Sequence, residues 1–229
     1  MRDRDRDHQR PTSVAARLRE QFAPAYLTLT SIIQGVALST LVIRVEGMSE
    51  QFTLANWLLA TATLLAFLLV WHEYLMQALA YVWMPTLVDS AVPFAILVTE
   101  LFLAHFVYGN ERVWFLIAGL AFVLGIVAWG TTHAHTQENA DVLKAVRGVS
   151  PMRVLPSVVS IALFLGIWAL YDVLGLGQAS GLVAAIAVLV IVGVLATTIP
   201  YWNRVLAYAR REDASEDAPS DEHSEEDSA

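Results

Sequence analysis

Four carboxylates lie inside apolar stretches of this 229-residue chain, where an ionisable side chain is costly. They are Glu73, Asp89, Glu100 and Asp172. An acid surrounded by hydrocarbon needs a partner, a bound proton or a water-filled cavity, so each of these intramembrane acids is a candidate for handling protons or cations. Glu100 lies deepest, counted from the ends of its stretch, and has the longest way to water. The structural alternative is that His72, Glu73 and Asp89 pair near the headgroups and that Glu100 hydrogen-bonds to a neighbouring helix.

The first apolar stretch carries more hydroxyl and amide groups than helix packing needs. Thr30, Ser31 and Gln34 fall on one face of a helix, where their oxygen atoms could coordinate or hydrate a cation. Leu38 and Leu41 follow them and could gate the same path by excluding water. Several copies of this helix around an axis would line a wet path, so these five residues are the predicted pore lining and gate.

A row of small residues forms a second face of the same stretch. Ser31, Gly35 and Ser39 are spaced by four residues. Small residues at this spacing let another helix approach closely. Helix packing explains the row without any further function.

Motifs for catalysis and for metal binding are missing from the sequence. It has no cysteine and no G-x-S-x-G, H-E-x-x-H, Walker A or G-x-G-x-x-G motif. His72 and His105 are predicted at opposite depths of the membrane, so they cannot share one metal. His133 and His135 are two residues apart and fall on different faces of a helix. We therefore expect no enzymatic activity, no metal and no cofactor.

Composition predicts the elements that must hold these residues. With 56% hydrophobic side chains and a mean hydropathy of +0.53, the chain is too apolar for a soluble domain. A membrane-spanning helix needs about 20 mostly apolar residues. Six stretches meet this need: residues 24–43, 54–80, 85–108, 113–131, 156–174 and 181–201. The predicted fold is all-α, a polytopic membrane protein with six transmembrane helices in a lipid bilayer.

The charges predict the orientation, because Lys and Arg are retained on the cytoplasmic side of a membrane. Two of the 14 basic residues, Arg44 and Arg112, fall in loops opposite the N-terminus, and the others fall on the N-terminal side. This predicts a multi-pass protein of the cell membrane with both termini in the cytoplasm. Its parts are an N-terminal segment (1–23), a transmembrane domain (24–205) and a disordered acidic tail (206–229), and no nucleic-acid partner is expected.

The stretch TSIIQGVALSTL, from Thr30 to Leu41, resembles the FSDGVFAI-type first helix of the transmembrane-protein-175 family of potassium channels. Gly35 and Val36 match that pattern, and Gln34 stands where the family has an Asp. The resemblance implies a homotetramer whose first helices line a potassium-conducting pore.

A second stretch supports the same resemblance. The sequence FLLVWHEYLMQALAYVW, followed by Pro93 and Phe94, is similar to the second and third helices of that family. In both, a Phe, a Trp and a His precede a short Trp-containing turn and a Pro-Phe pair. The likeness covers residues 26–94, and the six-helix layout is that of the single-repeat bacterial members.

Three functions follow as hypotheses, of which the first is the predicted function and the other two are its alternatives. The first is an oligomeric channel for a monovalent cation, with its path lined by the first helix and with potassium as the ion implied by the resemblance. The second is a proton-coupled transporter that uses Glu100, which stoichiometric coupling to a pH gradient would distinguish from a channel. The third is a membrane scaffold that conducts nothing.

Overall fold

The computed structural model describes residues 14–80, 87–134 and 150–216, and within these ranges the chain forms helices and no strand. The six α-helices are α1 (Val14–Met48), α2 (Leu54–Ala80), α3 (Leu87–Phe106), α4 (Glu111–Ala134), α6 (Ser150–Leu170) and α7 (Ser180–Glu216). Two short 3-10 helices, η1 (Ser49–Gln51) and η3 (Leu176–Ala179), join α1 to α2 and α6 to α7. The predicted all-α class is confirmed.

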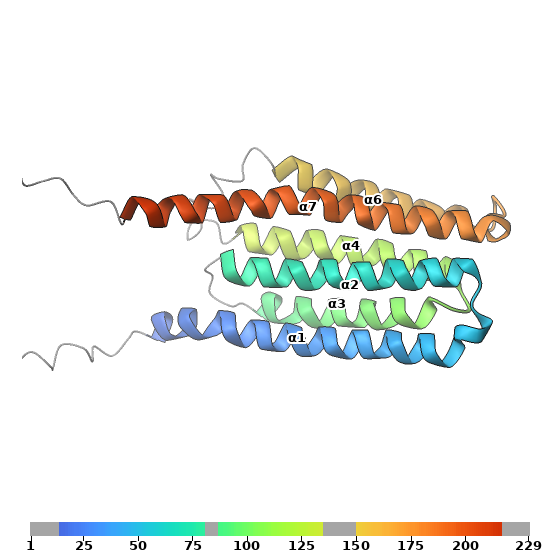
Figure 1. Ribbon diagram of the computed structural model, residues 1–229, viewed down its shortest axis with the longest axis horizontal. Helices are drawn as coiled ribbons and strands as arrows, with labels where there is room; N and C mark the ends of the chain where they lie inside the picture. The colour runs from blue at the N-terminus through green and yellow to red at the C-terminus, as the bar shows by residue number, and fades with distance from the viewer. Residues whose placement is uncertain (1–13, 81–86, 135–149, 217–229) are drawn as a thin grey trace, which may run out of the picture.

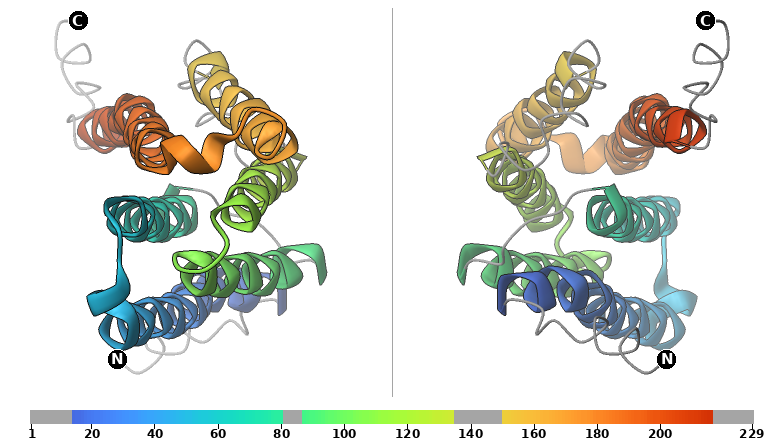
Figure 2. Two further views of the ribbon diagram at one scale, coloured as in Figure 1. Left: turned by 90° about the vertical axis from the view of Figure 1, so that its right-hand side faces the viewer. Right: turned by 90° about the vertical axis from the view of Figure 1, so that its left-hand side faces the viewer.

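The six helices run side by side along the long axis of the molecule (Figure 1) and form a ring when seen end-on (Figure 2). α1 packs against α2 and α3, α3 against α4, α4 against α6, α6 against α7, and α7 against α2. α1 begins and α7 ends at the same end of the bundle, which we call the terminal end; η1 and η3 mark the opposite loop end (Figure 1). From η3, α6 and α7 splay apart toward the terminal end (Figures 1 and 2).

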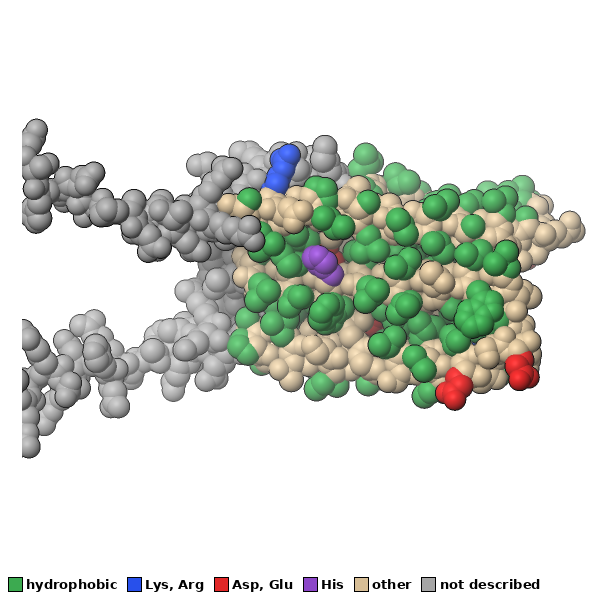
Figure 3. All heavy atoms as spheres, viewed as in Figure 1, with side chains coloured by type: hydrophobic (Ala, Val, Ile, Leu, Met, Phe, Trp, Pro, Cys, Tyr) green, Lys and Arg blue, Asp and Glu red, His purple; other side chains and the backbone are tan. Residues whose placement is uncertain are grey.

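Four helical segments are long and apolar enough to cross a membrane: Ala23–Gln51, Leu54–Ala80, Glu111–Thr131 and Leu176–Ala207. Two further apolar segments, Ala91–Phe106 and Val154–Leu170, are shorter. Hydrophobic side chains cover the flank of the bundle along its length, whereas the acidic side chains that stand out on this face lie at the loop end (Figure 3). So large an exposed apolar surface suits contact with lipid. The structure therefore indicates a membrane-embedded protein.

Several helix ends differ from the predicted boundaries. α1 begins at Val14, inside the predicted N-terminal segment, and continues to Met48, beyond the predicted end of the first stretch at residue 43. The predicted boundary at residue 205 lies inside α7, which continues to Glu216, and residues 217–229 of the predicted tail lie outside the described residues. A helix bonds its own backbone groups, so it can extend beyond the hydrocarbon into polar surroundings.

Polar side chains set where two helices begin at the loop end. Thr53 directly precedes α2, and Asn56 lies in its first turn. Asn56 Oδ1 accepts hydrogen bonds from the Thr53 backbone N–H at 2.9 Å and from the Thr53 hydroxyl at 2.8 Å. Asn110 Oδ1 accepts a bond from the Val113 N–H at 3.1 Å and so caps α4. Gly109, before this cap, has φ = 102°, a conformation that favours glycine.

Aromatic side chains fill the core of the loop half. Trp114, Phe115 and Phe164 are each at most 1% exposed, and their ring centroids lie 5.3 to 6.1 Å apart. We call these three residues the aromatic plug. The Trp114 Nε1–H donates to Thr63 Oγ1 at 3.0 Å, which holds the indole of α4 against α2.

Gly119 permits the close approach of α4 to α6, which predicts an effect of filling it. A Cβ at this position would lie 2.6 Å from Leu165 Cδ2, so Gly119→Val should overpack the interface and lower the stability by about 1–3 kcal/mol. The measurement is thermal unfolding of the purified protein in detergent. Gly130→Val is the matched control, because a Cβ there meets nothing within 4 Å. Equal losses in the two variants would contradict this account of the interface.

Candidate functional site

A buried hydrogen-bonded pair joins α1 to α3. Glu100 is 2% exposed and Gln34 is 9% exposed. The Gln34 Nε2 amide donates to both oxygens of the carboxylate, at 2.8 Å to Oε1 and 3.0 Å to Oε2. Within the described residues these are the carboxylate's only hydrogen bonds, and no Lys, Arg or His pairs with it. The acid predicted to lie deepest therefore has one neutral partner.

The nearest hydroxyl groups in sequence are engaged elsewhere. Thr30, one turn before Gln34, is 1% exposed and donates to the Leu27 carbonyl at 3.1 Å. Thr99, next to Glu100, donates to the Ile96 carbonyl at 2.7 Å. Both hydroxyls are hydrogen-bonded to carbonyls of their own helices. The Gln34 amide is therefore the group that donates to the Glu100 carboxylate.

Tyr74 of α2 lies beside this pair. Its side chain is 3% exposed, its ring meets that of Tyr26 of α1 edge-on with the ring centroids 5.8 Å apart, and it packs with Ile96 of α3, one turn from Glu100. The hydroxyl oxygen is buried and has no hydrogen-bond partner among the described residues. Burying an unbonded hydroxyl costs about 1–3 kcal/mol, so packing alone would favour Phe here.

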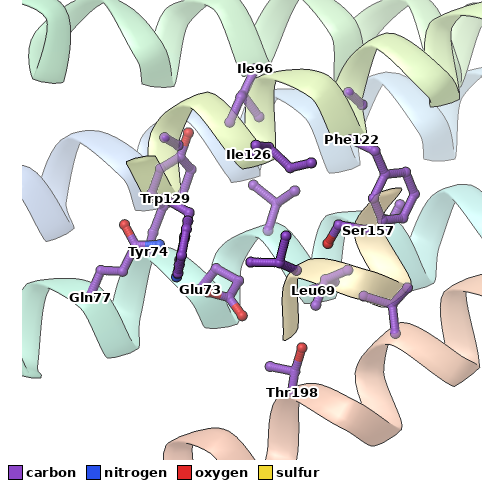
Figure 4. A pocket seen from close by; sticks show the side chains of 17 residues that line it. Leu69, Glu73, Tyr74, Gln77, Ile96, Phe122, Ile126, Trp129, Ser157 and Thr198 are labelled. Carbon is purple, nitrogen blue, oxygen red and sulfur yellow. The ribbon is translucent and has the colours of Figure 1, made fainter. Parts of the chain in front are cut away.

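A cavity of about 120 Å³ opens beside Tyr74, in the half of the bundle near the terminal end. Most of its wall is apolar, and its polar side chains are Glu73, Tyr74, Gln77, Trp129, Ser157 and Thr198. Figure 4 shows that α2, α4, α6 and α7 supply these residues and that Ile96 of α3 completes the wall. Glu73 accepts a hydrogen bond from Trp202 Nε1 at 3.3 Å. Since Ile96 and Glu100 are one helical turn apart, the cavity and the buried pair are neighbours.

The aromatic plug separates this cavity from a polar pocket at the loop end. That pocket has a volume of about 580 Å³. In its wall Arg112 pairs with Asp172, and the Tyr171 hydroxyl donates to Glu111 at 2.8 Å. Burial and this hydrogen bond raise the pKa of Tyr171 above its usual range. A largely apolar cavity and a polar pocket therefore lie on the two sides of a buried aromatic layer.

The structure divides the five predicted pore residues between two faces of α1. Thr30, Gln34 and Leu41 are buried within the bundle, whereas Ser31 and Leu38 are exposed on its surface. The prediction that Thr30, Ser31 and Gln34 share a face thus holds for Thr30 and Gln34, while Ser31 points outward. The expectation of a pore along a symmetry axis stays a prediction.

The row of small residues lies on the outer surface of α1. Ser31, Gly35 and Ser39 are all exposed, so none of the described helices covers them. The Ser39 hydroxyl donates to the Gly35 carbonyl at 2.8 Å and is satisfied within its own helix.

The other three predicted acids have different surroundings. Glu73 is half-buried at the cavity, and the side chain of Asp89 lies outside the described residues. Asp172 follows the end of α6 in an exposed turn, where it pairs with Arg112. The predicted stretch to residue 174 is therefore too long by four residues, and Asp172 does not lie within a helix.

Among the described residues no three His, Cys, Asp or Glu side chains gather closely enough to hold a metal ion. No known protein family, characterised protein or solved structure matches this chain. The resemblance to potassium channels therefore stays a prediction.

Tyr74 is a member of the site that the sequence did not predict. A phenol inside an apolar stretch, next to Glu73, was the available signal. Tyrosine is common in membrane helices near the interface, so its presence in the sequence does not by itself indicate a site. The burial of Tyr74 and its packing with Ile96, one turn from Glu100, do.

Proposed function

We propose that this protein is a proton-coupled transporter in which Glu100 binds and releases the proton. One observation carries the proposal: a carboxylate that is 2% exposed meets a single neutral amide in the middle of an apolar bundle. An ionised carboxylate without a cationic partner is costly in such surroundings, and a bound proton removes that cost. The group can therefore exchange a proton whenever water reaches it.

Gln34 can serve both protonation states of Glu100. Its amide N–H groups donate to the ionised carboxylate, which is the arrangement observed. When Glu100 carries a proton, its O–H can donate to the amide oxygen after the amide turns over. One side chain thus stabilises both states, as a reversible proton site requires.

The cavity and the aromatic plug support alternating access. The cavity adjoins the buried pair from the terminal half, and the plug closes the loop half with rings that are at most 1% exposed. A transporter needs one side open to its binding site while the other is shut. α6 and α7 splay apart toward the terminal end. A rearrangement of these two helices would close the terminal half and open the loop half.

The same proposal includes six membrane spans with both termini in the cytoplasm. Reporters at positions 5 and 140 and after 211 should be cytoplasmic, and reporters at 48, 110 and 178 should be external, because the basic residues favour that orientation. Cysteine labelling in intact cells is a suitable measurement, since the natural chain has no cysteine. Labelling of position 5 or 140 from outside would refute this topology.

The function is tested with full-length protein in liposomes that contain a pH-sensitive dye. Sodium, potassium and small organic amines are added outside in turn. We expect at least one of them to change the internal pH in a protein-dependent way. A potassium current with no change in internal pH would support the channel instead, as an oligomer with a tetramer implied by the resemblance. Protein-containing vesicles that pass no solute would support the scaffold.

A further inference from the structure

We infer that the Tyr74 hydroxyl relays protons between the cavity and Glu100. The inference rests on the proposed function and adds a residue that the sequence did not indicate. Tyr74 lines the cavity and packs with Ile96, which lies one helical turn from Glu100 on α3. A proton that enters the cavity reaches Glu100 by way of this phenol.

The unbonded hydroxyl is the observation that points to this role. In the described residues its oxygen is buried and unpaired, although a Phe would fill the same space without the cost of burying a hydroxyl. Unsatisfied buried groups in folded proteins need an explanation such as a water molecule or a functional partner. For the Tyr74 hydroxyl, the water molecule would lie in the cavity, and the functional partner would be the Glu100 carboxylate.

Few other titratable groups surround the hydroxyl. Tyr26 faces it from α1, Glu100 from α3, and Glu73 is its neighbour on α2. The described residues that α4, α6 and α7 contribute to the cavity wall include no Asp, Glu, His, Lys or Arg. In this part of the wall, therefore, no described carboxylate or imidazole competes for the proton and no described cation repels it.

The relay step balances at the phenol. The hydroxyl has no hydrogen-bond partner among the described residues, so a rotation of the side chains first brings it within hydrogen-bond distance of Glu100. Its oxygen then accepts a proton from a hydronium ion in the cavity, and its own O–H proton passes to a carboxylate oxygen of Glu100. One O–H bond forms on the phenol and one breaks, so Tyr74 ends unchanged, the hydronium becomes water and Glu100 becomes neutral. Release of the proton is the reverse of this step.

The test is a pH jump on the purified full-length protein, followed by infrared absorption of the protonated carboxyl group. The band that disappears in Glu100→Gln belongs to Glu100. In Tyr74→Phe we expect this band to rise roughly a hundredfold more slowly, as is typical when a positioned proton-transfer group is lost. Its final amplitude should equal that of the wild type, because the carboxylate and Gln34 are untouched. Tyr74→Phe should fold normally, since the lost hydroxyl has no partner among the described residues.

Tyr26→Phe is the matched control. It removes the hydroxyl from the other ring of the edge-on pair, and Tyr26 does not line the cavity. The Glu100 band should therefore rise at the wild-type rate in this variant. A wild-type rate in Tyr74→Phe would overturn the relay. A reduced amplitude at an unchanged rate would also overturn it, because it would show a merely structural role. The absence of any Glu100 band in the wild type at every pH would overturn the proposed function as well.

Discussion

In the Glu100→Gln variant we expect proton-coupled transport to fall by roughly a hundredfold or more, because the residue that carries the proton is lost. The new amide has the same shape as the protonated acid and can still bond to Gln34, so the bundle should remain folded. Removing a buried ionisable group should leave the stability equal to that of the wild type or higher. Solute-driven changes of internal pH in liposomes measure the transport, and thermal unfolding measures the stability.

Asp172→Asn is the matched control for Glu100→Gln. It also converts a carboxylate to an amide, but Asp172 lies in an exposed turn at the loop end. Loss of its pairing with Arg112 should change the stability by about 0–1 kcal/mol, as is usual for exposed ion pairs. Transport in this variant should equal that of the wild type. Unchanged transport in Glu100→Gln would show that the proton passes through another group.

Gln34→Leu should also have a large effect on stability and transport, because it removes the only described hydrogen-bond donor to Glu100. Leu is similar in size, so the space stays filled, but the buried carboxylate loses both hydrogen bonds at a cost of about 1–3 kcal/mol or more. Glu100 should then stay protonated and transport should stop. Thermal unfolding and the infrared band of Glu100 are the measurements.

A double variant separates this effect from simple loss of packing. When Gln34 and Glu100 are both replaced by Leu, no polar group is left unpaired, so the stability should return to near that of the wild type. Ser39→Ala is the control on the same helix, because the Ser39 hydroxyl is exposed and bonds to its own backbone. If Gln34→Leu costs as much in the Glu100→Leu background as alone, the two side chains are not coupled.

Much of the architecture could be predicted from the sequence, because it depends on local properties. Hydropathy summed over about 20 residues identifies a membrane helix without reference to any other part of the chain. The stretch 54–80 coincides with α2, and the all-α class is confirmed. The rarity of acids in apolar surroundings also singled out Glu100 before its partner was known. Helix ends in polar surroundings, such as Met48 and Glu216, lie outside what hydropathy can locate.

Only the tertiary structure decided which polar groups meet. Gln34 and Glu100 are 66 residues apart, and their pairing depends on how α1 and α3 rotate about their axes when they pack. That rotation turns Thr30 inward and Ser31 outward, although the two residues are adjacent. The place of Tyr74, in the cavity wall and against Ile96 one turn from Glu100, likewise depends on how α2, α3 and α4 pack together. The helical period defines the faces of each helix, but packing between helices determines which face is turned toward a partner.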